Sequence, residues 1–504
     1  MPRFEFRAAS PSEQATDLCV VPAYEGPEPG PGAREIGKAL GVDVGDVLRD
    51  NRFRGKVGEA FSVPTLGRAA PGSVLIVGVG PKAEAGPDRL RRAAGKISGN
   101  VAGFRRVSTT LAQAGRGSAE DAIEATVEGL LLGAYRFDQY KAKPAEDDGA
   151  VPRWETVTLL VSARQDARAA KRAMERGEIV AEATAWARDL VNTPAIDATP
   201  DFLAREARKM AREVGLEAKI LGKAELEKGG FGGILGVGRG SENPPRLIEL
   251  RYRGGGRSAP VALTGKGVTF DSGGLSIKDA QQMEWMKADM AGAATMLAAM
   301  RAIARLKPKV NVIAAIPSAE NLPGGSAIRP GDVLRHRGGK TSEVLNTDAE
   351  GRLILADALS YLAERKPRAI VDAATLTGAC MIALGTEIWG VMGNDRRLIR
   401  DLIEAGENVG EPGWELPLWQ PYRKQIDSTV ADVKNIGNRY GGAITAGLFL
   451  KEFVGEVPWA HMDIAGTAFA ESAGDYWPKG ATGNPVRTLI RFVERQADGA
   501  AAKR

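Results

Sequence analysis

Predicted strands and helices alternate along this chain of 504 residues, and this alternation limits the possible folds more than any other feature. In the second half, apolar runs of strand length alternate with amphipathic stretches of helix length. The predicted strands are residues 260–263, 310–316 and 368–373, and the predicted helices are residues 291–306 and 353–365. Alternation at this spacing predicts a mostly parallel sheet with helices on both faces, and such sheets bind ligands at the carboxyl ends of their strands.

The first 165 residues show the same alternation on a smaller scale. Residues 73–78 and 156–161 are predicted strands, and residues 90–114 are predicted to be largely helical. The Gly-Val-Gly sequence at 78–80 lacks the third glycine of a dinucleotide-binding loop, and a proline follows it directly. We therefore expect a structural α/β domain that carries no catalytic residue.

The length of the chain predicts two or three domains. We predict an N-terminal α/β domain (1–165), a connecting helix (166–192) that ends where a proline follows, and a larger C-terminal α/β domain (193–504). In the C-terminal domain, residues 200–214 are predicted to be a helix. The glycine-dense stretch 229–240 is predicted to be a packed loop, because large apolar residues interrupt its glycines.

Composition excludes several classes of protein. The chain is 43% hydrophobic and 26% charged, and its sequence contains no uninterrupted apolar run of membrane-spanning length. Its first residues contain no apolar segment of the kind found in secretory signals. Cys19 and Cys380 form no disulfide framework, and Cys380 lies in an apolar run that predicts a buried thiol. We expect a cytoplasmic protein with no membrane association.

The net charge of +5 is mild for this length. Basic clusters at 88–96 and 164–176 are typical of solvated helix faces. DNA binding would need a continuous basic patch with groove-reading or stacking residues, so it stays a minor hypothesis.

The polar segment at 346–353, Asn-Thr-Asp-Ala-Glu-Gly-Arg-Leu, carries two acids two positions apart. In an extended loop, Asp348 and Glu350 would point the same way, and Arg352 would stand beside them at the start of a helix. Alone, the segment fits either acids that favour a helix dipole or a metal site.

A second segment, residues 264–290, favours the metal site. It is predicted to follow a strand as a glycine-spaced loop with Lys266, Asp271 and Lys278, and Asp289 lies near its end. The alternative is a glycine-rich turn with surface charges. Four carboxylates on the two segments are enough for two divalent ions, which hydrolases often hold about 3.5–4 Å apart. Oxygen-rich ligation admits Mn²⁺, Mg²⁺ or Zn²⁺.

The sequence contains few of the residues that other types of hydrolase use. The chain has two histidines, His336 and His461, so a His-rich zinc site or a Ser-His-Asp triad would need one of them. A dinuclear phosphoester hydrolase usually uses several histidines, and two are too few for this alternative. We expect His461 to have a structural role or to support the site from outside.

The two charged segments, with the order GKGVTFDSGG, SIK, ADM and NTDAEGRL, resemble the leucine (cytosol) aminopeptidase family, including its bacterial members. Members of this family are dinuclear metallo-exopeptidases that release N-terminal residues, with leucine preferred. Further similar segments lie at 187–195, 234–250, 372–379 and 459–468.

The resemblance implies roles for individual residues. Lys266, Asp271, Asp289, Asp348 and Glu350 would bind two divalent ions (Mn²⁺ or Zn²⁺, possibly Mg²⁺). Lys278 and Arg352 would be catalytic, with Arg352 holding a bicarbonate. Met286, Thr375, Leu376 and Gly378 match positions that line the substrate site. The family also implies a homohexamer that acts on short peptides. A DNA-binding protein with a vestigial site is disfavoured, because the motifs are complete.

Overall fold

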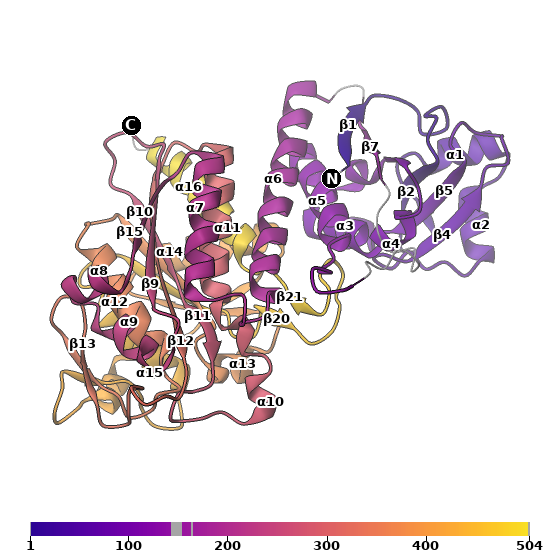
Figure 1. Ribbon diagram of the computed structural model, residues 1–504. Helices are drawn as coiled ribbons and strands as arrows, with labels where there is room; N and C mark the ends of the chain where they lie inside the picture. Colours follow the sequence, from indigo (N-terminus) through magenta and orange to yellow (C-terminus); the bar gives the residue numbers. More distant parts are fainter. Residues whose placement is uncertain (1, 143–153, 163–164, 502–504) are drawn as a thin grey trace. The chain divides into compact units, whose positions relative to one another are not determined.

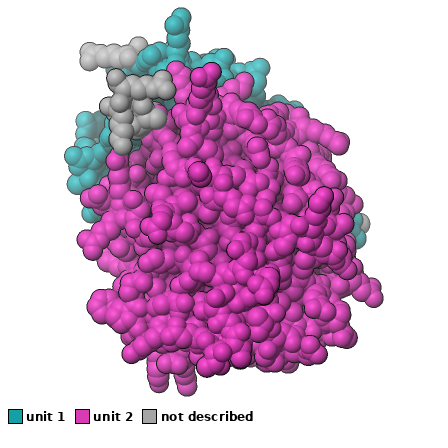
Figure 2. All heavy atoms as spheres, turned by 90° about the vertical axis from the view of Figure 1, so that its left-hand side faces the viewer, with its two compact units in different colours: residues 1–185, 472–479 teal, residues 186–471, 480–504 magenta. Residues whose placement is uncertain are grey.

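The computed structural model describes residues 2–142, 154–162 and 165–501, so Arg164 of the predicted basic cluster lies outside the described residues. The chain forms two compact units (Figure 2). The first comprises Met1–Ala185 and Ser472–Lys479, and the second comprises Trp186–Glu471 and Gly480–Arg504. Both units have helices packed on a β-sheet, so the predicted two-domain α/β fold is confirmed.

The sheet of the first unit has the strand order β1-β7-β6-β2-β5-β4, and β3 pairs with β2. Neighbours from β1 to β5 are parallel, and β3 and β4 are antiparallel to their partners. Alternate residues of β2 pack on opposite faces, Val20 in the cluster of α3 and α5 and Val21 in the cluster of α1 and α2. The bounds are β1 Arg3–Arg7, β2 Leu18–Tyr24, β3 Glu28–Pro29, α1 Ala33–Leu40, α2 Val44–Asp50, β4 Ala60–Pro64, β5 Ser73–Gly78, α3 Pro87–Lys96, β6 Arg106–Thr109, α5 Ala119–Gly133 and β7 Thr156–Leu160.

The prediction that residues 90–114 are largely helical is wrong in its second half. Helix α3 ends at Lys96, α4 (Ser98–Val101) is one turn, and the chain then forms strand β6 and a 3₁₀ turn, η2 (Leu111–Ala114). The β-branched residues Val107 and Thr109 are stiff at χ1 and fit a buried strand better than a helix.

The sheet of the second unit has the order β17-β16-β19-β15-β10-β12-β9-β8, and β11 pairs with β12. Figure 1 labels β9, β10, β11, β12 and β15 of this sheet. Strands β19, β15, β10 and β12 are parallel. Strand β9 runs antiparallel to β12 and β8, and β16 runs antiparallel to β19 and parallel to β17. Helices α7, α11 and α16 pack together on one face, and α9, α12 and α15 pack together on the other. The bounds are α7 Pro200–Val214, β8 Glu217–Leu221, α9 Gly232–Val237, β9 Arg246–Arg253, β10 Val261–Gly265, β11 Gly267–Asp271, α11 Ala291–Leu306, β12 Asn311–Asn321, α12 Gly351–Ala363, β15 Ala369–Ala374, β16 Trp389–Gly393, β17 Gly413–Glu415, α15 Gly442–Lys451, β19 Trp459–Asp463 and α16 Val486–Ala501.

The start of helix α11 packs directly on the sheet because it is built from small residues. A Cβ on Gly292 would lie 2.2 Å from the carbonyl oxygen of Ala373 in β15, so only glycine fits at this crossing. This close approach fixes the short 3₁₀ segment η4 (Met286–Met290) that precedes α11 and carries Asp289.

Several other predictions can be compared with the second unit. Helices 200–214 and 291–306 have the predicted bounds. The stretch 229–240 is packed, since Phe231 and Ile234 are buried, but it forms α9 and a 3₁₀ turn instead of a loop. Helix α6 (Ala167–Asn192) spans the predicted connecting segment. No helix in the described parts of the chain is long and apolar enough to cross a membrane.

Candidate metal centre

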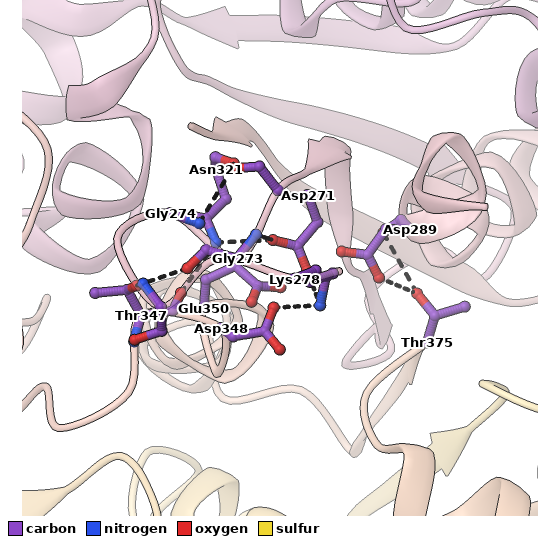
Figure 3. Close-up of polar contacts among 12 residues, drawn as sticks. Asp271, Gly273, Gly274, Lys278, Asp289, Asn321, Thr347, Asp348, Glu350 and Thr375 are labelled. Carbon is purple, nitrogen blue, oxygen red and sulfur yellow. Dashed lines mark hydrogen bonds and ion pairs between the residues drawn. The ribbon is translucent and has the colours of Figure 1, made fainter. Parts of the chain in front are cut away.

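The residues predicted to form the site converge at the carboxyl ends of β10, β11 and β15 (Figure 3). Lys266 links β10 to β11, Asp271 ends β11, and Thr375 follows β15. The predicted glycine loop after residue 263 is wrong in part, because the segment from Gly267 to Asp271 is a strand that pairs with β12. Glycine does not prevent strand pairing here.

The segment with Asp348 and Glu350 also differs from its predicted conformation. The chain turns at Thr347 and Asp348 instead of extending, and Glu350 is the N-cap of α12 with helical φ and ψ. The preceding strand β14 (Thr341–Glu343) belongs to a separate three-stranded sheet. The two carboxyl groups converge nevertheless, because a turn followed by a helix start brings them to the same side.

Three carboxylates form a compact cluster. Asp271, Asp348 and Glu350 each offer an oxygen, and these oxygens lie within 4.8 Å of one another. Asp271 and Glu350 are almost fully buried. Burial and the nearby charge of Asp271 raise the pKa values of Asp348 and Glu350, because like charges in a poorly solvated site disfavour ionisation. Such a cluster is stabilised by cations.

Lys266 provides one such cation. Its Nζ lies 2.7 Å from Asp289 Oδ1 and 2.7 Å from Glu350 Oε1, and it donates a hydrogen bond to the Thr375 carbonyl oxygen at 3.1 Å. Burial lowers the pKa of Lys266, but the carboxylates of Asp289 and Glu350 outweigh burial and raise it above its ordinary value. Burial also raises the pKa of Asp289 well above its ordinary value.

Lys278 provides the second cation. Its Nζ lies 3.0 Å from Asp271 Oδ2 and forms an ion pair with Asp348. Each lysine thus bridges two carboxylates, and four negative charges face two positive charges. Asp289 Oδ2 and Glu350 Oε2 are buried and have no hydrogen-bond partner among the described residues. This excess of oxygen acceptors fits divalent cations, which prefer carboxylate ligands.

Neighbouring polar groups orient the carboxylates. Asp271 Oδ1 accepts hydrogen bonds from the Gly273 amide at 2.9 Å and from Asn321 Nδ2 at 2.8 Å. Asn321 Nδ2 also donates to the Thr347 carbonyl oxygen at 2.9 Å, so it ties β12 to both charged segments. Thr375 Oγ1 donates to Asp289 Oδ1 at 2.8 Å. Sequence reasoning missed Asn321, because the predicted strand ended at residue 316 whereas β12 extends to Asn321.

Arg352 lies behind the cluster and is buried. Its Nη1 donates to the backbone oxygen of Asn435 at 2.8 Å, and burial lowers the pKa of Arg352 to about 10. The side chain of Asn435 accepts from the Leu345 amide at 2.9 Å and donates to the Asn346 carbonyl oxygen at 2.6 Å. Asn435 therefore holds both the turn before Asp348 and the guanidinium of Arg352. Sequence reasoning missed Asn435, because no local pattern links it to the two segments.

Gly351 is required by the stem of Lys266. A Cβ at position 351 would lie 2.6 Å from Lys266 Cδ and 2.6 Å from Lys266 Cε. Real Cβ atoms are not found so close to another side chain, so the glycine gives Lys266 its path to the carboxylates.

A pocket of about 640 Å³ opens onto the cluster. Glu350 and Arg352 are absent from its lining because they lie buried behind it. The lining contains all the other residues predicted to form the site: Lys266, Asp271, Lys278, Met286, Asp289, Asp348, Thr375, Leu376 and Gly378.

Comparison with known proteins identifies the family. Residues 185–490 match the description "Cytosol aminopeptidase family, catalytic domain", and residues 20–144 match the N-terminal domain of the same family. The chain belongs to the cytosol aminopeptidase family. It is a metallo-aminopeptidase, a hydrolase that binds divalent metal ions.

Relatives resemble this aminopeptidase over nearly its whole length. It is 46% identical to a probable cytosol aminopeptidase of Geobacter sp. (strain M21), covering 98% of this chain and 100% of that protein. The identity to a probable cytosol aminopeptidase of Streptomyces griseus is also 46%, covering 98% of each chain.

Solved structures give the same result. The bottromycin maturation enzyme BotP in complex with Mn has a TM-score of 0.85 and 37% identity, covering 96% of this chain and 100% of that one. A mutant of tomato leucine aminopeptidase has a TM-score of 0.87 and 31% identity, covering 98% of this chain and 97% of that one.

The two histidines of this aminopeptidase are buried away from the pocket. The Nε2 atom of His336 lies 2.7 Å from Ser342 Oγ, and its Nδ1 atom lies 3.3 Å from Asp357 Oδ1. This arrangement resembles a Ser-His-Asp triad. All three residues are at most 1% exposed, so no substrate reaches them. His461 Nδ1 lies 2.5 Å from Asp372 Oδ1 on the neighbouring strand.

Proposed function

We propose that this aminopeptidase releases apolar residues, leucine among them, from the N-termini of short peptides, using two divalent metal ions. The observation that carries the proposal is the convergence of four carboxylates on the buried Lys266 and the partly buried Lys278 beside an open pocket. The proposed ligands are Lys266, Asp271, Asp289, Asp348 and Glu350.

The donor set supports two ions. Two pairs of carboxylates, each bridged by one lysine, offer two places where a metal ion would replace an ammonium charge. Lys266 would have to lose its proton to become a ligand, which the charge of the incoming ions favours. Mn²⁺ is a suitable ion because BotP, a structural relative, was solved in complex with Mn; Zn²⁺ and Mg²⁺ are alternatives. Bound divalent ions activate water and polarise carbonyl groups.

The residues of the chain would perform the remaining tasks. Lys278 lines the pocket and, once released from its carboxylate partners, would donate a hydrogen bond to the carbonyl oxygen of the scissile bond. Thr375 would keep Asp289 in place through their hydrogen bond. The free α-amino group of a peptide would be bound as a neutral amine at one of the metal positions, so a substrate would need a free N-terminus.

Arg352 is proposed to hold a bicarbonate that takes the proton of the attacking water. Its buried Nε has no hydrogen-bond partner among the described residues, and it lies in the first turn of α12. Both features suit an anion. The four carboxylates near the pocket would all serve as ligands, so none of them would be free to act as the base.

Assembly and location are further parts of the proposal. Several large apolar side chains of the second unit are exposed, among them Ile382 at 90%, Trp414 at 64% and Tyr440 at 80%. An oligomer would cover such side chains, which supports the proposed homohexamer. The two free, buried cysteines suit the reducing cytoplasm.

The test is hydrolysis of leucine p-nitroanilide by metal-stripped protein before and after Mn²⁺ is added. We expect metal-dependent cleavage, with no cleavage of the N-acetylated substrate. A variant with Asp348→Asn should bind less Mn²⁺ and lose activity, whereas Asp332→Asn, in an exposed ion pair with Arg329, should behave as the wild type. Absence of cleavage with every divalent ion, by folded protein, would refute the proposal.

A further inference from the structure

The part of the pocket beyond the carboxylates has a mixed lining, with polar residues such as Gln281 and Gln282, and it contains an aromatic pair. Trp285 and Phe469 both line the pocket, and their ring centroids lie 5.3 Å apart with an interplanar angle of 83°. Edge-to-face packing of this kind is a favourable arrangement of two rings and makes a rigid wall. Both side chains are partly exposed. Their uncovered surface therefore faces space that a substrate can enter.

Small and adaptable residues also line this region. Ala465 and Ala468 line the pocket next to Phe469, and their short side chains leave room beside the ring. Met286 and Met381 also line the pocket. Methionine fits irregular shapes and makes favourable sulfur contacts with rings. An aromatic side chain of a substrate can make these sulfur-ring contacts, whereas a leucine side chain cannot because it has no ring.

We propose that the pocket prefers peptides whose first residue is aromatic over those that begin with leucine, and that Trp285 and Phe469 set this preference. The inference rests on the proposed aminopeptidase function, because it assigns the pocket to the first residue of the substrate. A third ring packed against Trp285 and Phe469 adds ring-ring contact beyond simple burial. This contact is expected to raise kcat/KM for phenylalanine over leucine by about two- to tenfold.

The test compares kcat/KM for the p-nitroanilides of phenylalanine, leucine and alanine with Mn²⁺-loaded full-length enzyme. The ratio of phenylalanine to leucine should exceed one in the wild type. In Phe469→Leu and Trp285→Leu, which keep apolar bulk but remove a ring, the ratio should fall by about two- to tenfold. Tyr140→Leu, which removes an exposed ring of the first unit outside the pocket, should leave the ratio unchanged.

A second variant tests the space instead of the rings. Ala468→Met keeps the aromatic pair and fills the room beside it, so it should lower kcat/KM for phenylalanine more than for alanine. A wild-type ratio at or below one, or a ratio unaffected by both ring deletions and by Ala468→Met, overturns the inference while leaving the aminopeptidase function intact. Absence of metal-dependent cleavage of all three substrates overturns both.

Discussion

Replacing Asn435 with alanine should separate the two tasks of the residue, which are holding the turn before Asp348 and holding Arg352. Asn435 is fully buried, and its side chain satisfies the Leu345 amide and the Asn346 carbonyl oxygen. Each buried backbone group left without a partner costs about 1–3 kcal/mol. Two groups lose their partner, so we expect the free energy of unfolding to fall by about 2–6 kcal/mol.

The same substitution should affect catalysis through Arg352. The backbone oxygen of residue 435 accepts from Arg352 Nη1, and its position depends on the lost side-chain hydrogen bonds. A displacement of about 1 Å in a catalytic group costs about 100-fold in turnover, so kcat should fall by about that factor while KM changes little.

Urea unfolding and steady-state kinetics with Mn²⁺ measure the two effects of Asn435→Ala separately. Asn438→Ala is the matched control, because Asn438 is an exposed asparagine three positions away. Mn²⁺ binding measured by titration calorimetry shows whether the ligands themselves have moved. A stability loss of the expected size with unchanged kcat would refute the assignment of Arg352 positioning to Asn435.

Three further predictions concern the charged cluster. Arg352→Ala should lower kcat by about 100-fold, while metal analysis should find the same Mn²⁺ content as in the wild type. Loss of both activity and Mn²⁺ would contradict the proposed role of Arg352. Gly351→Ala should weaken Mn²⁺ binding in calorimetry, because the new Cβ would displace the stem of Lys266. Burial and the charge of Asp271 raise the pKa values of Asp348 and Glu350, so the metal-free fold binds more protons than the unfolded chain. Its melting temperature should therefore fall as pH rises from the ordinary carboxyl pKa through the raised values, and added Mn²⁺ should remove this trend.

Regular elements were predictable where local signals agreed. Helix α7 begins with Thr199 as N-cap and Pro200 in its first turn, and it ends at Gly215 in the left-handed region. These are the residues that favour helix starts and ends, so its bounds could be predicted from the sequence alone. Strand β6 was missed because four residues of strand between short helical turns give too little periodicity to outweigh the flanking alanines.

The charged residues of the site could be named from the sequence, but the residues that hold them in position could not. Asn321 lies 50 positions after Asp271 and Asn435 lies 83 positions after Arg352, so only the folded chain brings each pair together. The protonated state of Lys266 in the metal-free site was also not predictable. It depends on Asp289 and Glu350, which arrive from two different segments.

The segment Ser472–Lys479 limits how this protein can be truncated or divided into separate domains. These eight residues belong to the first unit, where Asp475 pairs with Lys96 at 3.1 Å and Tyr476 packs against Gly95. A gene truncated after residue 185 would therefore encode a first unit that lacks part of its own surface. An engineer who wants that unit alone would have to supply the missing peptide, either in trans or through a linker to a new C-terminus.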